Sequence, residues 1–260
     1  MANGTDCVVI GGQGIVGQAT RKALDIPYFF DTKESNITLE EASKKLFIFF
    51  CTPTPTDEKG GQEAGVKIIR DYIFQIKQYG GRNIFVIRST VIPGTCRAIA
   101  KEFDVMVASN PETLSEDTWE RDALKPRITI IGADDVPSRN ALVELWKPVQ
   151  AKYNLVTDTV TAEMMKYAFN MFFITKIVYA NQLFDACEVV GANYKVIREA
   201  LMAHPWGSKH HFKVVHKDGR GGGGRCLPKD IKAFAKWSNL PFFQKVEELN
   251  TKYLNASGKQ

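Results

Sequence analysis

A run of glycines directly after a short apolar segment is the feature that most constrains the fold of this chain. Asp6–Gly11 has the composition of a strand, Gly12-Gln13-Gly14-Ile15-Val16-Gly17 follows it, and a helical pattern continues through Leu24. Strand, G-x-G-x-x-G and helix in this order are typical of the turn that binds a dinucleotide, because glycines there permit a tight turn and a close approach of pyrophosphate to backbone N–H groups. The pattern predicts a doubly wound α/β domain with a dinucleotide cofactor.

An acidic residue stands at the end of the second predicted strand. Tyr28–Phe30 is followed by Asp31, about 20 residues after the glycines, where an acid accepts hydrogen bonds from the adenosine ribose hydroxyls. A carboxylate at this position disfavours a 2′-phosphate, so we expect NAD rather than NADP as the cofactor. Lys33 lies close by and weakens this preference.

A run of threonine and proline follows the third predicted strand, Leu46–Phe50. Because proline cannot continue a central strand, Thr52-Pro53-Thr54 is expected to form a loop at the carboxyl edge of the sheet, where ligands bind in doubly wound folds. A rigid connecting loop is the alternative for any one of these residues. The residues expected to contact NAD in this part of the chain are Gly12, Gly14, Ile15, Val16, Gly17, Asp31, Lys33, Thr52, Pro53 and Thr54.

Strand and helix patterns alternate up to residue 158 and then change. Further strands are expected at Asn83–Arg88, Val105–Ala108, Arg127–Ile131 and Tyr153–Val156, and helices at Gly65–Tyr79 and Val136–Val149. Thr161–Val190 contains neither proline nor glycine and is expected to be one helix of roughly 45 Å, ended by Gly191. Shorter helices are expected at Tyr194–Ala203, Lys229–Ser238 and Phe242–Leu254. The predicted fold is α/β: a Rossmann-type doubly wound sheet that binds NAD over residues 1–158, followed over 159–260 by an all-α domain built on one long helix.

The stretch Gly219–Asp230 carries five glycines within six residues, followed by one cysteine, a proline, a lysine and an aspartate. Cys226 stands just before a predicted helix, with Arg225 and Lys229 beside it. A thiol near a positive helix end and cationic side chains is expected to have a lowered pKa, and the thiolate is the nucleophilic form. On composition alone, a glycine linker followed by an inert buried cysteine explains the stretch equally well.

This stretch closely resembles the catalytic-cysteine motif of the UDP-glucose/GDP-mannose dehydrogenase family, Gly-Gly-Ser-Cys-Phe-Pro-Lys-Asp. Gly222 stands where the family usually has an aromatic residue, and Arg225 where it has a small one. Ser89–Thr95 is similar to the family's Ser-Thr-Val-x-Pro-Gly-Thr, and Lys166 and Asn170 occupy the two polar positions of its Ala-Glu-x-x-Lys-Tyr-x-x-Asn. The resemblance covers nearly the whole chain, in the family's order.

A further segment, Asn110–Glu116, resembles the family's Asn-Pro-Glu-Phe-Leu-Arg-Glu. Thr113 and Ser115 replace the aromatic residue and the arginine, which changes the substrate side of the motif. Glu112 and Glu116 occupy its two acidic positions, for which the resemblance implies substrate contact and acid/base work. Without the family, two glutamates in a polar loop are most often solvated surface.

The resemblance implies a four-electron oxidation of a nucleotide-sugar primary alcohol to the uronate with two NAD, most closely UDP-glucose to UDP-glucuronate. The resemblance implies that Cys226 forms a thiohemiacetal and then a thioester with the substrate. It implies that Lys166 and Asn170 stabilise the oxyanions. Asp230, with Thr90 and Glu116, is implied to position the water that hydrolyses the thioester. Thr90 is also implied to touch the nicotinamide. The residues implied to bind the sugar substrate are Glu112, Glu116, Lys166, Asn170, Gly221, Gly223 and Gly224.

Composition excludes several other classes. The net charge of +5 is spread along 260 residues, so no nucleic-acid partner is expected, and no apolar run is long enough to span a membrane. Neither the five cysteines nor the four histidines have metal-ligand spacing, so we expect no metal and a reducing cytoplasm. The four histidines, all between residues 204 and 216, are expected to be solvated or to face phosphate. The long helix 161–190 favours a homodimer.

Two other classes stay open at this point. A β-hydroxyacid dehydrogenase of the 6-phosphogluconate type shares the Rossmann domain, the long helix and the Lys166/Asn170 pair, but offers no reason for Cys226. An NAD-binding protein that has lost catalysis, or that needs a partner chain, is the third possibility. Relatives in the family continue into a nucleotide-binding α/β domain, so the chain is expected to be a short form without it.

Overall fold

The computed structural model describes residues 3–149, 151–216 and 219–256 of the chain. Contacts divide it into two compact units. The first runs to Pro55 and resumes over Gln62–Lys166, and the second consists of Thr56–Gly61 and the chain from Tyr167 onward. The domain boundary expected between residues 158 and 159 stays a prediction. The division by contacts falls inside the long helix, between Lys166 and Tyr167.

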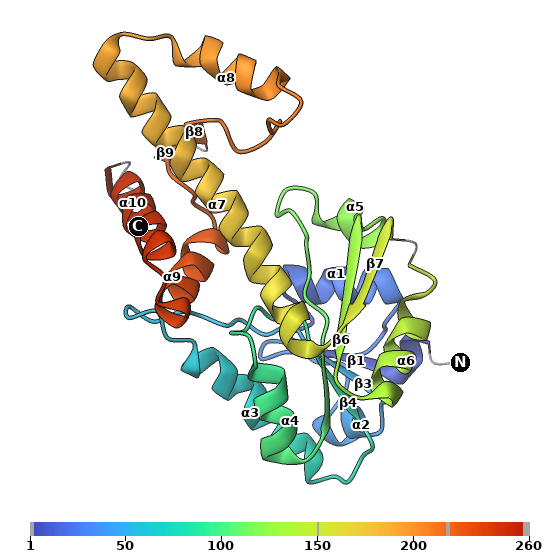
Figure 1. The fold of residues 1–260 in the computed structure, drawn as a ribbon. Coiled ribbons are helices and arrows are strands. Elements are labelled where there is room, and N and C mark those ends of the chain that lie inside the picture. The colour runs from blue at the N-terminus through green and yellow to red at the C-terminus, as the bar shows by residue number, and fades with distance from the viewer. Residues whose placement is uncertain (1–2, 150, 217–218, 257–260) are drawn as a thin grey trace. The chain divides into compact units, whose positions relative to one another are not determined.

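The first unit is built on one seven-stranded sheet in the order β2-β1-β3-β4-β5-β6-β7 (Figure 1). Its strands are β1 (Cys7–Ile10), β2 (Phe29–Phe30), β3 (Phe47–Phe50), β4 (Ile84–Ile87), β5 (Met106–Ser109), β6 (Ile128–Ala133) and β7 (Tyr153–Thr157). All neighbouring pairs are parallel except β5 and β6. The strand order reverses between β1 and β3, and in such sheets the crevice at the carboxyl ends beside this reversal is where ligands bind.

Helices cover both faces of this sheet (Figure 1). The helices of this unit are a short 3₁₀ turn (Gly4–Asp6), α1 (Ile15–Leu24), α2 (Leu39–Ser43), α3 (Glu63–Lys77), α4 (Thr95–Phe103), α5 (Trp119–Leu124) and α6 (Val136–Trp146). Alternate residues of β1 enter two different cores: Cys7 and Val9 pack in the core that includes α6, whereas Val8 and Ile10 pack in the core that includes α3 and α4. Strands buried on both faces explain the unbroken apolar runs in the sequence.

The second unit is helical. The long helix α7 (Thr159–Val190) begins in the first unit and continues into this one, where it is followed by α8 (Tyr194–Ala203), α9 (Leu227–Ser238) and α10 (Pro241–Ala256). Tyr167 of α7 stacks on Phe234 of α9 with ring centroids 5.2 Å apart. Two strands of two residues each, β8 (Val215–His216) and β9 (Gly219–Arg220), pair antiparallel ahead of Gly221. The predicted fold class, a doubly wound α/β sheet followed by helices around one long helix, is confirmed.

Several short elements were not predicted from sequence. α2 spans five residues and depends on a capping box, in which Thr38 and Glu41 exchange hydrogen bonds between side chain and backbone. α4 begins at Thr95, directly after a glycine with φ of 96°, in a segment that the sequence presents as a loop motif. The strand pair β8–β9 was not predicted either, and α6 ends at Trp146 rather than at Val149. Among the described residues, no helix combines the length and the apolar character needed to cross a bilayer.

Candidate active site

The glycine turn after β1 separates glycines that the fold requires from one that it does not. A Cβ at Gly17 would lie 2.2 Å from the Gly11 carbonyl oxygen, and one at Gly12 would lie 2.4 Å from Cβ of Phe29, so packing itself demands both. At Gly14, which caps α1, the nearest atom to a Cβ is the Gly11 carbonyl oxygen at 3.6 Å, an ordinary contact. The space left at the N-terminus of α1 therefore suits an anionic group.

The other residues expected to bind the cofactor lie at the same carboxyl edge. The Asp31 carboxylate accepts a hydrogen bond from the N–H of Gln13 at 3.0 Å. Thr54 donates to the carbonyl oxygen of Thr90 at 2.7 Å, which ties the loop after β3 to the loop after β4. The Thr52 hydroxyl is buried and finds no hydrogen-bond partner among the described residues. An unpaired buried hydroxyl, an acid and a side-chain-free helix start fit a dinucleotide, while Lys33 is exposed.

A buried ion pair occupies the first unit where α7 begins. The Lys166 ammonium lies 2.7 Å from Oε1 of Glu112 and 3.1 Å from the Glu112 carbonyl oxygen, and both side chains are less than one tenth exposed. Burial raises the pKa of the Glu112 carboxyl, but the Lys166 charge, the Leu114 N–H and the Arg88 charge outweigh burial and hold that pKa below its usual value. The lysine is thus fixed as a buried cation rather than extended into solvent.

Glu163, one turn before Lys166, holds the segment that follows Thr90. Its buried carboxylate accepts the N–H groups of Gly94 at 2.5 Å and Cys96 at 2.7 Å, at the N-terminus of α4. Burial raises the pKa of Glu163 despite these hydrogen bonds. Thr90 is half-buried and Glu116 is exposed.

In the second unit, Cys226 forms the N-cap of α9 and is exposed, whereas the other four cysteines are buried. Asp230 in the first turn is fully buried; it accepts a hydrogen bond from the Asn170 amide at 2.6 Å and lies 2.5 Å from the Lys229 ammonium. An inert buried cysteine is therefore the wrong interpretation of this stretch. The lowered pKa expected for the Cys226 thiol stays a prediction.

The glycine run before Cys226 is anchored by Asn250 of α10. The Gly222 N–H donates to the Asn250 side-chain oxygen at 2.7 Å, and the Asn250 amide donates back to the Gly222 carbonyl at 3.2 Å. Gly221 and Gly224 have positive φ of 82° and 81°, which favours glycine. A Cβ at Gly222 would lie 3.2 Å from Ile174, while Gly223 is exposed. The run is an ordered loop rather than a linker.

The histidine-containing stretch behaves differently from expectation at one position. His211 is half-buried and stacks on Phe173 with centroids 4.8 Å apart, whereas His204, His210 and His216 are exposed. Burial, with the charges of Lys176 and His210, lowers the pKa of His211 to about 4. Among the described residues, no group of three or more His, Cys, Asp or Glu side chains could hold a metal ion.

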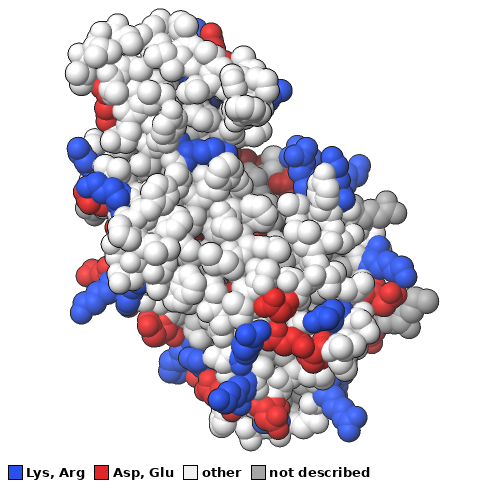
Figure 2. Space-filling model, viewed as in Figure 1, with Lys and Arg blue, Asp and Glu red and all other residues white. Residues whose placement is uncertain are grey.

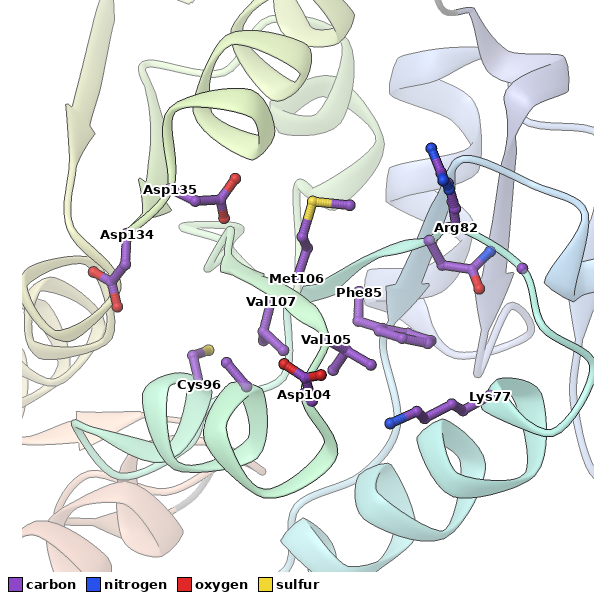
Figure 3. A pocket seen from close by; sticks show the side chains of 13 residues that line it. Lys77, Arg82, Phe85, Cys96, Asp104, Val105, Met106, Val107, Asp134 and Asp135 are labelled. Atoms are coloured by element: carbon purple, nitrogen blue, oxygen red, sulfur yellow. The ribbon is translucent and has the colours of Figure 1, made fainter.

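A separate groove of about 560 Å³ lies at the opposite edge of the sheet (Figure 3). It is bordered by the amino ends of β4 and β5 and by the turn after β6, with Lys77, Arg82, Asp104 and Asp134 around it. None of the residues predicted for catalysis or binding lines this groove. On the face shown in Figure 2, basic and acidic side chains are interspersed over most of the charged surface.

Two family models match this chain in succession. The NAD binding domain of the UDP-glucose/GDP-mannose dehydrogenase family matches residues 28–150, and the central domain of the same family matches residues 160–252. The chain belongs to the UDP-glucose/GDP-mannose dehydrogenase family. Its first unit carries the NAD binding domain, and NAD is the cofactor of that domain.

Curated relatives and solved structures in this dehydrogenase family resemble the chain over most of its length. The UDP-glucose 6-dehydrogenase of Rickettsia conorii is 35% identical over 207 residues, which is 77% of this chain and 46% of the relative. The GDP-mannose 6-dehydrogenase of Pseudomonas aeruginosa is 30% identical over 200 residues, 71% of this chain and 45% of the relative. The chain spans about half the length of these curated relatives.

A UDP-glucose dehydrogenase structure from Pyrobaculum islandicum superposes with a TM-score of 0.80 at 26% identity, covering 95% of this chain and 68% of that one. A 3-hydroxyisobutyrate dehydrogenase of Mycobacterium tuberculosis gives a TM-score of 0.70 at 10% identity, covering 96% of this chain and 94% of that one, which shows likeness of fold alone.

Several residues of this dehydrogenase site were not assigned a role from sequence. Glu163 is the glutamate of the Ala-Glu-x-x-Lys motif, but the sequence does not show that its carboxylate caps α4. Lys229 was expected only to lower the pKa of the Cys226 thiol, and its ion pair with Asp230 was not predicted. Asn250 carries no sequence signal, because its partner Gly222 is 28 residues away and meets it only through packing. The substitutions at positions 113 and 115 lie on exposed residues of the Glu112 loop.

Proposed function

We propose that this chain catalyses the NAD-dependent oxidation of a nucleotide-sugar primary alcohol to the carboxylate, with UDP-glucose as the substrate. The observation that carries the proposal is the exposed thiol of Cys226 at the N-terminus of α9, whose first turn holds Asp230 in a buried pair with Asn170 and in contact with the partly exposed Lys229. Identity of 35% to UDP-glucose 6-dehydrogenases supports the choice of sugar nucleotide. NAD, when bound, accepts the hydride in each of the two oxidation steps.

Cys226 serves as the covalent nucleophile in this scheme. Its thiolate adds to the carbon of the intermediate aldehyde and forms a thiohemiacetal, loss of hydride from that carbon gives a thioester, and water then releases the carboxylic acid and the thiol. Covalent capture divides a difficult oxidation into steps and retains the aldehyde. The N-terminal end of α9 stabilises the thiolate needed for the first addition.

Lys166 and Asn170 stabilise the oxyanions that form when the carbon becomes tetrahedral. Glu112 fixes the Lys166 ammonium through its carboxylate and its carbonyl oxygen, and Asp230 fixes the Asn170 amide. An amide nitrogen carries two hydrogens, so Asn170 can serve Asp230 and an oxyanion together. Each such donor is worth about 3 kcal/mol of transition-state stabilisation in comparable sites.

The remaining roles follow the family resemblance. Asp230, with Thr90 and Glu116, activates the water that hydrolyses the thioester, and Glu112 and Glu116 contact the sugar. Gly221, Gly223 and Gly224 permit the substrate to approach the thiol. Close approach of the substrate requires residues without side chains at these three positions.

Assembly and location are part of the same proposal. The chain forms a homodimer through α7, where Phe172, Tyr179, Val189 and Val190 leave large apolar surfaces exposed. The protein works in the cytoplasm, in keeping with five cysteines that form no disulfide among the described residues.

The test is a substrate panel with wild type and Cys226→Ser. NADH formation is followed with UDP-glucose, GDP-mannose, UDP-N-acetylhexosamines and 6-phosphogluconate. We expect turnover with UDP-glucose that Cys226→Ser loses or halts at the covalent stage. Turnover of 6-phosphogluconate that is indifferent to the substitution would instead identify a β-hydroxyacid dehydrogenase, and NAD binding without turnover of any sugar would indicate that a partner chain is required.

A further inference from the structure

A buried arginine connects the two loops that carry Thr90 and Glu112. Arg88 directly follows β4 and is 7% exposed. Its guanidinium donates to the side-chain oxygen of Asn110, whose own amide donates to the carbonyl of Ile130 at 2.5 Å. Because the three residues come from the ends of β4 and β5 and from β6, Arg88 holds the start of the Glu112 loop against its neighbouring strands.

The charge of Arg88 acts on the Glu112–Lys166 pair. Burial raises the pKa of Glu112, and Arg88 is one of the groups that together hold it below its usual value, after Lys166 and the Leu114 N–H. The charged or titratable groups that face Glu112 are Lys166, Arg88 and Cys51, and Asp122 lines the same cavity. A buried cation that loses its counter-charge is strongly destabilised, so an ionised Glu112 is what keeps Lys166 charged and in place.

A small cavity beside the guanidinium is lined by both Arg88 and Glu112, which places the two side chains near each other. It measures about 30 Å³ and is lined by Arg88, Asn110, Glu112, Thr129 and Trp146, among others. Three of these carry a buried polar atom without a partner among the described residues, namely Nε of Arg88, the Thr129 hydroxyl and the indole nitrogen of Trp146. The Trp146 ring lies 5.1 Å from the guanidinium carbon. The space suffices for a water molecule, which suits three such atoms.

We propose that Arg88 is a positioning residue for the Lys166–Glu112 pair: its guanidinium, bound to Asn110 and lying over the Trp146 ring, holds the start of the Glu112 loop and places a second positive charge near the carboxylate that binds the Lys166 ammonium. The proposal rests on the proposed function only in giving Lys166 a catalytic role. The arrangement requires the planar fork of arginine as well as its charge, since the fork is what Asn110 and Trp146 hold.

The experiment follows the Glu112 carboxyl itself by ¹³C NMR of protein labelled at the glutamate side-chain carboxyl carbon. The Glu112 signal is assigned by its absence in Glu112→Gln. In wild type it stays ionised below the pH at which ordinary glutamates protonate. We expect Arg88→Gln to raise the titration midpoint by roughly half a pH unit, because one nearby opposite charge is lost while Lys166 and the Leu114 N–H stay. Arg88→Lys raises it less, since the charge stays but the fork does not.

The control is Arg97→Gln, which removes an exposed guanidinium paired with Asp134 and leaves the Glu112 midpoint unchanged. A wild-type midpoint in either folded Arg88 variant overturns the proposal, and Arg88→Lys decides the matter if Arg88→Gln does not fold. The acid limb of the kcat/KM profile moves to higher pH along with the NMR midpoint. Because the NMR titration needs no turnover, an inactive wild type contradicts the proposed function without affecting this test.

Discussion

Glu112 and Lys166 illustrate what a single buried pair contributes to this protein. Glu112→Gln removes the carboxylate and leaves the Lys166 ammonium buried without its counter-charge. We expect the substitution to lower the free energy of unfolding by about 3–5 kcal/mol. Urea denaturation measures this loss, with Glu116→Gln as the matched control, because Glu116 is exposed in the same loop and its substitution should change the stability by less than about 0.5 kcal/mol. Equal effects of the two substitutions would contradict a buried pair.

His211 gives the stability of the protein a specific pH dependence. Its pKa is lowered from its ordinary 6.5 to about 4, so between these values the unfolded chain binds a proton that the folded chain does not. Stability therefore decreases as the pH falls from about 6.5 to about 4. His211→Asn, which tolerates the positive φ of 74°, should flatten this part of the curve while lowering its level through lost stacking on Phe173.

The control for His211 is His216→Asn, at an exposed position of the same stretch. Thermal unfolding across this pH range measures both variants. The account is contradicted if His216→Asn, rather than His211→Asn, changes the slope.

Single residues were predictable from sequence to the extent that a motif fixed them. Asp31, Thr52 and Lys166 lie where strand ends and helical spacing indicated, yet the partner of each charge depended on the fold. The Arg88 side chain shows the limit: it precedes a quoted motif, but its role follows from Asn110 and Trp146, which are 22 and 58 residues further along the chain.

At the scale of elements, the start of α1 carries the clearest prediction. Gly14→Ala should change the free energy of unfolding by less than about 1 kcal/mol, because its Cβ meets only an ordinary contact, yet weaken NAD binding by at least about tenfold, because the methyl group takes the space of the pyrophosphate. Gly17→Ala should destabilise the protein by about 1–3 kcal/mol through its clash with Gly11.

Calorimetric titration with NAD and urea denaturation separate these two effects. Unchanged NAD affinity in a folded Gly14→Ala protein would contradict the assignment of this turn to the cofactor.

Long elements were predicted well, and several short helices were not, for a physical reason. The buried strands and α7 carry apolar or uninterrupted patterns that span their whole length. α2, α4 and α5 span five, nine and six residues, and the first two depend on capping by Glu41 and Glu163 rather than on a pattern of their own. Glu163 lies 67 residues from Cys96, so no local signal could connect it with the start of α4.

For the whole molecule, the central question is whether a chain with the NAD binding and central domains completes the reaction of relatives about twice its length. Most of the site residues proposed for the chemistry lie in these two domains: Thr90 and Glu116 in the first match, and Lys166, Asn170, Cys226 and Asp230 in the second. The proposal therefore assigns each covalent step to residues within these two matches.

The most direct test is the number of NADH molecules formed per UDP-glucose, measured with limiting sugar nucleotide and excess NAD. The account predicts two for the wild type and no more than one for Cys226→Ser, because the thioester cannot form without the thiol. One NADH per UDP-glucose in the wild type, or two in Cys226→Ser, would contradict it.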